Sequence, residues 1–307
     1  MIRLSNGYEF EFMAASGALG FNGRGWPVPK YWILKLLLGL YPNLIVPVIK
    51  TLTLPARRGD FKAIYDSDNY VVNAVGLDNP GFDVWKEKHL KRINQNVILS
   101  VAGNSLTEIK YLSVQLAKTK LGNSFIKGIE FNPSCPNVNK KWDLDEIFKA
   151  MEILKGQTRS PIGIKIGYHQ KNYLGIALAV SPFAEWISFN SVPWEMVFPN
   201  KKSPLMEKYG VSGAVSGGAI FEINGKMAHE IKKAGIKIPL VISSVGWHPF
   251  FEDAYEEAKE ILFWADAVSF GSLFRKHPTW PIRIAKRYFD RRGGKNDYSK
   301  NWGLGCG

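Results

Sequence analysis

Short runs of apolar and β-branched residues alternate along this chain with longer stretches in which apolar residues recur at helical spacing. The clearest helical stretch is FFEDAYEEAKEILFWA, at 250–265, where apolar and acidic residues alternate. Repeated alternation of strand and helix favours a parallel sheet, and eight units in about 270 residues fit a (β/α)8 barrel better than an open sheet. The eight apolar runs are 9–15, 44–50, 97–102, 126–132, 162–167, 185–190, 239–244 and 266–271.

Two further apolar segments do not belong to this alternation. NYVVNAV, at 69–75, lies between the second and third units, and we interpret it as part of an excursion over one end of the barrel. YWILKLLLGLY, at 31–41, contains a lysine and is too short to span a bilayer, so we predict a buried or amphipathic helix there. The fold predicted is therefore α/β, with a single (β/α)8 TIM-barrel domain over 1–307 and one excursion between its second and third units.

The carboxyl ends of the predicted strands carry small residues, amides and two lysines. In such barrels the active site lies at these ends, and glycines there let a ligand approach the backbone. Phosphate groups are commonly held by the loops after the last two strands, which here contain SSVG at 243–246 and FGS at 270–272. The candidate cofactor-binding residues on this rim are Ala15, Ser16, Gly17, Lys50, Thr51, Asn132, Lys165, Ser243, Ser244, Gly246, Gly271 and Ser272.

Composition limits the location and the partners of the protein. Hydrophobic residues make up 46% of the chain and charged residues 22%, which is ordinary for a soluble globular protein. With two cysteines in 307 residues we expect no disulfide framework, and we predict a reducing, cytoplasmic location. The first residues, MIRLSNGYEFEF, contain no apolar core of a signal peptide. A net charge of +13 attracts anions, from nucleotides to nucleic acids, although solvated surface lysines would produce the same surplus.

The loop after the fourth predicted strand, FNPSCPNV at 131–138, brings one of the two cysteines to the rim. Two prolines flank Cys135 and disfavour both helix and central strand, so we expect a rigid loop. Asn132 and Asn137 can each offer a donor and an acceptor to a planar ring with amide edges. The thiol can act as a general base if its pKa is lowered or if substrate desolvates it. The alternative is a small buried side chain that packs a turn.

The loop and several other segments resemble one enzyme family. FNPSCPNV is similar to the NxSCPNV loop of the dihydroorotate dehydrogenases, in the soluble class that uses cysteine as its base. VNAVGLDNPGFD, at 72–83, resembles that family's INxxGLxNPG pattern, and MAASG, at 13–17, resembles its NASG. The matches keep the family's order from about residue 9 to residue 275, and the weaker ones are Lys50 in VIKT, Lys165 in IGIKIG, Asn190-Ser191, VSGGAI at 215–220 and FGS at 270–272.

This resemblance implies a tightly bound FMN across the barrel mouth and the oxidation of dihydroorotate to orotate in pyrimidine biosynthesis. Cys135 would take the proton from C5 of the substrate while a hydride passes from C6 to flavin N5. Lys50 would lie near both flavin and substrate, and Lys165 would face the N1–C2 edge of the flavin, where negative charge develops. Gly217 would join the cofactor-binding residues of the rim. No metal is implied, and the substrate-binding residues would be Lys50, Asn73, Gly76, Leu77, Asn132, Asn137, Asn190 and Ser191.

The chain departs from the family pattern where a flavin phosphate would bind. The family's GxGGI is replaced by SSVGW at 243–247, so one glycine of the phosphate loop is Val245. The family's IKP is replaced by IFE at 220–222, and an acidic residue that pointed toward a phosphate would be unfavourable.

Three other functions and several partners remain open on the sequence, and one of these functions is that of a non-catalytic flavin-binding protein. A tRNA dihydrouridine synthase also has a catalytic cysteine after a barrel strand, and a reductase of another cyclic amide could use the same side chains. NAVGLDNPG, at 73–81, and the VSGGAI stretch resemble the subclass that passes electrons to an iron–sulfur and FAD subunit. We expect such a partner, association of the chain with copies of itself, and neither a nucleic-acid nor a membrane partner.

Overall fold

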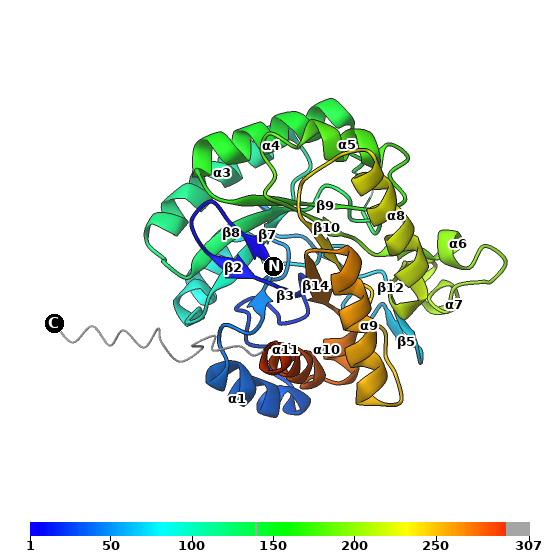
Figure 1. Ribbon diagram of the computed structural model, residues 1–307. Coiled ribbons are helices and arrows are strands. Elements are labelled where there is room, and N and C mark those ends of the chain that lie inside the picture. Colours follow the sequence, from blue (N-terminus) through cyan, green and yellow to red (C-terminus); the bar gives the residue numbers. More distant parts are fainter. Residues whose placement is uncertain (139, 293–307) are drawn as a thin grey trace.

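The computed structural model describes residues 1–138 and 140–292, and its centre is a closed barrel of parallel strands (Figure 1). Neighbouring strands follow the order β4-β3-β14-β13-β10-β9-β8-β7. Parallel bridges from Val48 to Ile98 and from Leu52 to Val101 join the segment directly after β4 to β7 and close the sheet. The predicted (β/α)8 barrel is confirmed, with strands β3 (Phe12–Ala14), β4 (Val46–Pro47), β7 (Val97–Val101), β8 (Ile126–Phe131), β9 (Ile162–Ile166), β10 (Trp186–Phe189), β13 (Leu240–Ile242) and β14 (Ala267–Phe270).

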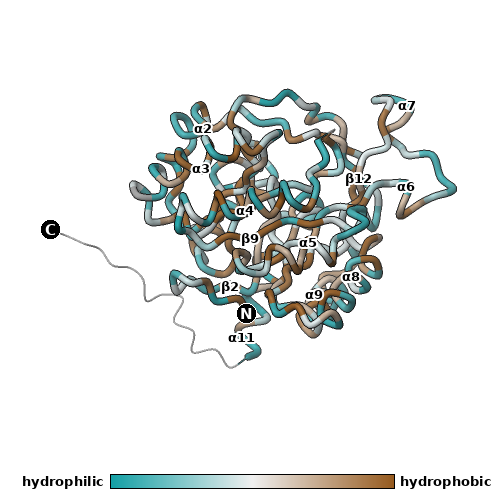
Figure 2. The backbone as a smooth tube through the Cα atoms, turned by 90° about the horizontal axis from the view of Figure 1, so that it is seen from above, coloured by the Kyte–Doolittle hydropathy of each residue, from teal (hydrophilic) through white to brown (hydrophobic). Residues whose placement is uncertain are grey.

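Most of the helices surround the barrel, and the long ones bury one face against it. In Figure 2 the tube of α4 changes repeatedly between teal and brown, as expected for a helix with one polar and one apolar face. This helix begins at a capping box, in which Asp143 accepts from the amide of Glu146 and the Glu146 side chain accepts from the amide of Asp143. The helices are α1 (Trp32–Leu40), α2 (Phe82–Lys88), α3 (Leu106–Leu121), α4 (Leu144–Thr158), α5 (Tyr173–Ala179), α6 (Trp194–Val197), α7 (Met206–Tyr209), α8 (Phe221–Lys233), α9 (Phe251–Trp264), α10 (Ser272–Lys276) and α11 (Trp280–Arg291).

An amino-terminal hairpin closes one end of the barrel. Its strands, β1 (Ile2–Arg3) and β2 (Glu9–Phe10), pair antiparallel, so the predicted run 9–15 is divided between this hairpin and β3. Ile2 and Phe10 are buried in one cluster with Trp186. A Cβ on Gly163 would lie 1.9 Å from the Trp186 ring, so only glycine leaves room for this indole inside the barrel. With this end filled, a ligand can enter only from the carboxyl ends of the strands.

A four-stranded antiparallel sheet covers part of the other end. It contains β5 (Ile64–Asp66), β6 (Tyr70–Asn73), β12 (Ala214–Gly217) and β11 (Val192–Pro193), in the order β11-β12-β6-β5. The predicted excursion between the second and third units supplies β5 and β6 and is confirmed. A second excursion, over 191–217 after the sixth barrel strand, supplies β11 and β12 and was not predicted; its α6–α7 segment projects from the barrel in both views (Figures 1 and 2).

The apolar run at 31–41 forms α1 and is amphipathic, in agreement with one of the two predicted forms. Leu34 and Leu38 are buried. The other face exposes large apolar side chains to solvent, namely Trp32, Ile33, Leu36 and Leu40. No helix in the described part of the chain is both long and apolar enough to cross a membrane.

Candidate active site

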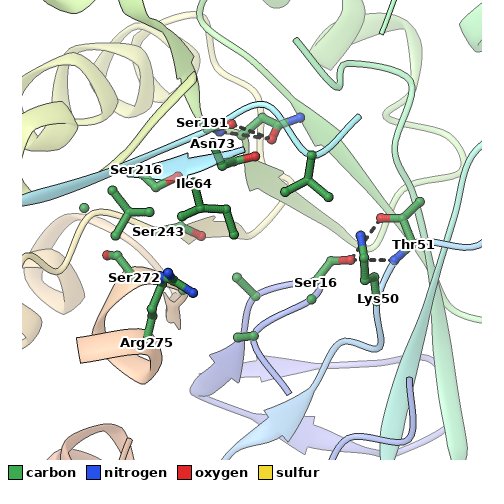
Figure 3. A pocket seen from close by; sticks show the side chains of 18 of the residues that line it. Ser16, Lys50, Thr51, Ile64, Asn73, Ser191, Ser216, Ser243, Ser272 and Arg275 are labelled. Atoms are coloured by element: carbon green, nitrogen blue, oxygen red, sulfur yellow. Dashed lines mark hydrogen bonds between the residues drawn. The ribbon is translucent and has the colours of Figure 1, made fainter. Parts of the chain in front are cut away.

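A cavity of about 640 Å³ opens at the carboxyl ends of the barrel strands, under the antiparallel sheet. Almost every residue selected from the sequence lines it, although these residues come from all parts of the chain. The predicted residues that line the cavity are Ala15, Ser16, Gly17, Lys50, Thr51, Asn73, Gly76, Leu77, Asn132, Cys135, Asn137, Lys165, Asn190, Ser191, Gly217, Ser243, Gly271 and Ser272. Figure 3 shows Ser243 and Ser272 on one side of this space and Ser16, Lys50 and Thr51 on the other.

Asparagine side chains on one side of the cavity hold one another in place. The amide of Asn137 donates to the backbone oxygen of Asn73 at 2.9 Å and to its side-chain oxygen at 3.1 Å. The amide of Asn190 donates to the hydroxyl and backbone oxygens of Ser134, both at 3.0 Å, and to the side-chain oxygen of Asn132 at 3.3 Å. These groups are therefore oriented without a ligand, which reduces the entropy that binding must remove. We call Asn73, Asn132, Cys135, Asn137 and Asn190 the cysteine side.

The turn that carries Gly76 and Leu77 has an unusual backbone. Both residues have positive φ, 68° and 60°, and for leucine this conformation costs on the order of 1–3 kcal/mol. The Arg57 side chain donates to the oxygen of Gly76 at 3.0 Å and helps to hold the turn. Backbone strain of this kind clusters at ligand sites, and here both residues lie on the cavity wall.

Cys135 faces the cavity with a thiol whose pKa is raised. Burial raises that pKa above its ordinary value, while a backbone hydrogen bond with Asn137 and the charges of Lys50 and Lys165 lower it by a smaller amount. The thiol is therefore protonated at neutral pH in the absence of substrate. Burial also lowers the pKa of Lys50, against smaller opposite effects of Asp78 and Cys135.

The two predicted lysines are buried, each with 8% of its surface exposed. Lys50 has its amine 5.4 Å from the centre of the Phe61 ring. The amine of Lys165 lies 4.0 Å from a carboxylate oxygen of Glu130, which is 1% exposed and was not selected from the sequence. That oxygen of Glu130 accepts no hydrogen bond from any residue that the structure describes. The available sequence signal was a carboxylate inside the apolar run 126–132.

A chain of hydroxyl groups fixes the loop that carries Lys50. The Ser16 hydroxyl lies 2.9 Å from that of Thr51 (Figure 3). The Thr51 hydroxyl in turn lies 2.9 Å from that of Ser100. Ser16 also donates to the oxygen of Ile49 and accepts from the amide of Thr51, both at 3.0 Å. These bonds tie the ends of β3 and β4 together on either side of Lys50.

Two residues predicted to bind cofactor do not line the cavity. Ser244 is fully buried, and its hydroxyl accepts from the Asn224 amide at 2.6 Å. The backbone amide of Gly246 donates to a carboxylate oxygen of Glu257 at 2.7 Å. Glu222, the acidic residue of the IFE segment, is exposed and does not line the cavity either.

Sequence reasoning also missed Arg275, which lines the cavity from α10. Figure 3 shows its side chain beside Ser272 and Ser243. The sequence signal was weak, because a single basic residue three positions after Gly271-Ser272 is ordinary on a protein surface. We call Ser216, Ser243, Ser272 and Arg275 the arginine side.

The sequence of this chain is similar to that of a known enzyme family. A family model described as dihydroorotate dehydrogenase matches residues 41–286. A relative from Thermoanaerobacter pseudethanolicus, named dihydroorotate dehydrogenase B (NAD(+)), catalytic subunit, is 28% identical over 284 residues, which cover 89% of this chain and 86% of the relative. A second relative of the same name, from Carboxydothermus hydrogenoformans, is 30% identical. The match covers 75% of this chain and 73% of that relative.

Solved structures match less closely. The match to the crystal structure of phosphonopyruvate hydrolase covers 68% of this chain and 65% of the hydrolase chain, with 11% sequence identity and a TM-score of 0.36. A likeness at this level carries no argument about function.

Proposed function

Since the chain belongs to the dihydroorotate dehydrogenase family, we propose that it oxidises dihydroorotate to orotate in pyrimidine biosynthesis, with FMN as its cofactor. The observation that supports this most is the cysteine side, where Cys135 faces the cavity among four asparagines. These amides can satisfy both edges of a ring that is built from amide groups.

The cavity suits a flavin on three grounds. Its volume of about 640 Å³ lies within the usual range for a pocket that holds a cofactor. Small strand-end residues allow close approach of a planar ring: Gly17 and Gly217 both have positive φ, and a Cβ on Gly217 would lie 2.9 Å from the Ser272 hydroxyl. The Ser243 hydroxyl oxygen is buried and has no hydrogen-bond partner among the described residues, so a ligand group would satisfy it.

Each active-site group has a defined part in the reaction. FMN, when bound, supplies the acceptor for the hydride that leaves C6 of dihydroorotate. The Cys135 thiolate takes the proton from C5, so the C5–C6 single bond becomes the double bond of orotate. Lys50 and Lys165 provide fixed positive charge beside the reacting groups, in a cavity wall that excludes water from most of their surface. The asparagines and the Gly76-Leu77 turn hold the substrate ring.

We further propose that electrons leave through a partner. The relatives' name, catalytic subunit of a NAD(+) enzyme, supports an iron–sulfur and FAD subunit that passes electrons to NAD. With only two cysteines in the chain we place the protein in the cytoplasm. Two expectations stay predictions. One is that the chain associates with copies of itself. The other is that a single domain spans 1–307, a range that includes residues outside those described.

Anaerobic flavin reduction tests the substrate assignment. Dihydroorotate should bleach the bound flavin, while dihydrouracil, which lacks the carboxylate, should do so about 100-fold more slowly or worse, because a site built for a charged group is left unsatisfied. Reoxidation is then compared with fumarate, with NAD, and with NAD plus an electron-transfer subunit. Equal reduction by both compounds would favour the reductase of another cyclic amide, and reduced flavin that reacts only with a uridine in tRNA would favour the dihydrouridine synthase.

A further inference from the structure

The arginine side of the cavity contains a strong anion-binding group whose role the family pattern does not explain. The Arg275 guanidinium lines the cavity, beside the Ser243 and Ser272 hydroxyls in Figure 3. The Ser272 hydroxyl makes only a long bond, 3.4 Å, to the oxygen of Val245, and that of Ser243 makes none among the described residues. Two hydroxyl donors and a guanidinium fork therefore lie together with unused hydrogen-bonding capacity.

The backbone group that the family pattern would offer here is already engaged. The family has GxGGI after the seventh barrel strand, whereas this chain has Val245 followed by Gly246. The amide of Gly246 donates to Glu257 at 2.7 Å, and Glu257 also lies 2.8 Å from the ring nitrogen Nε2 of His248. An anion in the cavity must therefore accept hydrogen bonds from donors other than the Gly246 amide.

The charges around Arg275 favour an anion. None of the described residues that line the cavity is Asp or Glu, whereas Lys30 and Arg275 both line this end. The Lys30 amine donates to the backbone oxygen of Arg275 at 2.9 Å, and its pKa is lowered by burial and by the charges of Arg275 and Lys276. The counter-ion of Arg275 is Asp66 of β5, at 2.6 Å, and neither partner of this pair is deeply buried. One carboxylate thus balances several cations.

We propose that Arg275, with the Ser243 and Ser272 hydroxyls, binds the phosphate of FMN in this chain and takes over the role of the altered glycine loop. This inference rests on the proposed FMN-dependent function. A phosphate carries up to two negative charges and matches the planar guanidinium fork. Asp66 competes with the phosphate for the same fork, so this carboxylate limits the affinity for FMN.

A comparison of the affinities for two flavins, one with and one without a phosphate, isolates the contribution of the phosphate contact. The full chain is stripped of flavin and titrated with FMN and with riboflavin, which lacks the phosphate, and the quenching of flavin fluorescence is measured. In Arg275→Gln the Kd for FMN should rise about tenfold or more, because a charge-assisted bidentate contact is lost, while the Kd for riboflavin stays unchanged. Unchanged riboflavin binding also shows that the variant is folded. The matched control is Arg3→Gln, which removes the same charge from an exposed side chain at the closed end of the barrel.

The Asp66→Asn variant tests whether the ion pair between Arg275 and Asp66 has only a structural role. It leaves the guanidinium free, so FMN should bind as tightly as in the unaltered protein or more tightly, again with no change for riboflavin. If the pair only supported the fold, both variants would weaken both flavins equally, and the inference would be overturned. It would be overturned as well if Arg275→Gln bound FMN with unchanged Kd. An unaltered protein that binds neither flavin would refute the proposed function itself, which distinguishes the two failures.

Discussion

The cysteine side and the arginine side of the cavity both consist of polar side chains, but these side chains are held in different ways. On the cysteine side, Asn137 bonds to Asn73, and Asn190 bonds to Asn132 and Ser134, at 2.9 to 3.3 Å. On the arginine side, the Ser243 hydroxyl is unpaired among the described residues, and Arg275 is paired with a partly exposed carboxylate. One side is complete without a ligand, and the other has donors that only a ligand would satisfy.

This difference fits the role that we propose for each side. A group that transfers a proton must be placed to within a fraction of an ångström, so its neighbours have to be rigid before substrate arrives. A phosphate group is a large anion that accepts hydrogen bonds from many directions, and several arrangements of donors can hold it. If these roles hold, the cysteine side should tolerate few substitutions, while the arginine side can replace a glycine loop by an arginine.

The largest effect is expected from Cys135→Ala, which removes the base that we propose on the cysteine side. The rate constant for flavin reduction by dihydroorotate should fall by at least about two orders of magnitude, the usual weight of general base catalysis. Flavin affinity should be unchanged, because the thiol faces the substrate. Stopped-flow absorbance measures the first quantity and fluorescence titration the second. Near-normal reduction would mean that Cys135 only packs the loop.

The pH dependence of the same step should be set by the raised pKa of Cys135. The active form is the thiolate, so the rate of flavin reduction should rise with pH from neutral to above pH 9, the ordinary value for a thiol. The charge of Lys50 lowers this pKa, so Lys50→Met should move the profile further toward alkaline pH. The control is Lys149→Met, which removes an exposed lysine of α4. Superimposable profiles for the Lys50 variant and the unaltered protein would exclude this electrostatic role.

A smaller effect is expected from Ser134→Ala, which tests whether the cysteine side is held by its own hydrogen bonds. The buried hydroxyl of Ser134 donates to the backbone oxygen of Lys165 at 2.7 Å and accepts from Asn190 at 3.0 Å. Its removal leaves a buried acceptor without a donor, which costs about 1–3 kcal/mol of unfolding free energy. Urea unfolding of the flavin-free protein measures this cost. A loss below about 0.5 kcal/mol would mean that the loop is held by other contacts.

Much of the fold could be predicted from the sequence because strands that are buried on both faces read as continuous apolar runs. The run IGIKIG is an example: Ile162–Ile166 is fully buried, and Lys165 emerges at its carboxyl end. The second excursion could not be found in this way. Its strands β11 and β12 are short, and β12 pairs over its whole length with β6, a strand of the first excursion far away in the chain. Such a pairing leaves no local periodicity in the sequence.

The arginine side was predicted least well, for two physical reasons. Adjacent residues of a strand point to opposite faces, and here Ser243 lines the cavity while Ser244 does not. The dipeptide alone does not reveal this difference. The Ser244 hydroxyl instead meets Asn224 of α8. Arg275 pairs with Asp66, 209 residues away in the chain, and no motif links such distant charges. The cysteine side was easier because Asn132, Cys135 and Asn137 lie in one compact loop.

The smallest effect on stability is expected from Ser243→Ala, the same chemical change made on the arginine side. The Ser243 hydroxyl has no hydrogen-bond partner among the described residues, so its loss should change the unfolding free energy of the flavin-free protein by less than about 0.5 kcal/mol. FMN affinity should nevertheless fall several-fold, because the hydroxyl would donate to the ligand. The pair Ser134→Ala and Ser243→Ala thus compares identical deletions on the two sides. A stability loss in the Ser243 variant as large as that in the Ser134 variant would mean that both sides are completed by the protein alone. The distinction between a preassembled side and a ligand-completed side would then fail.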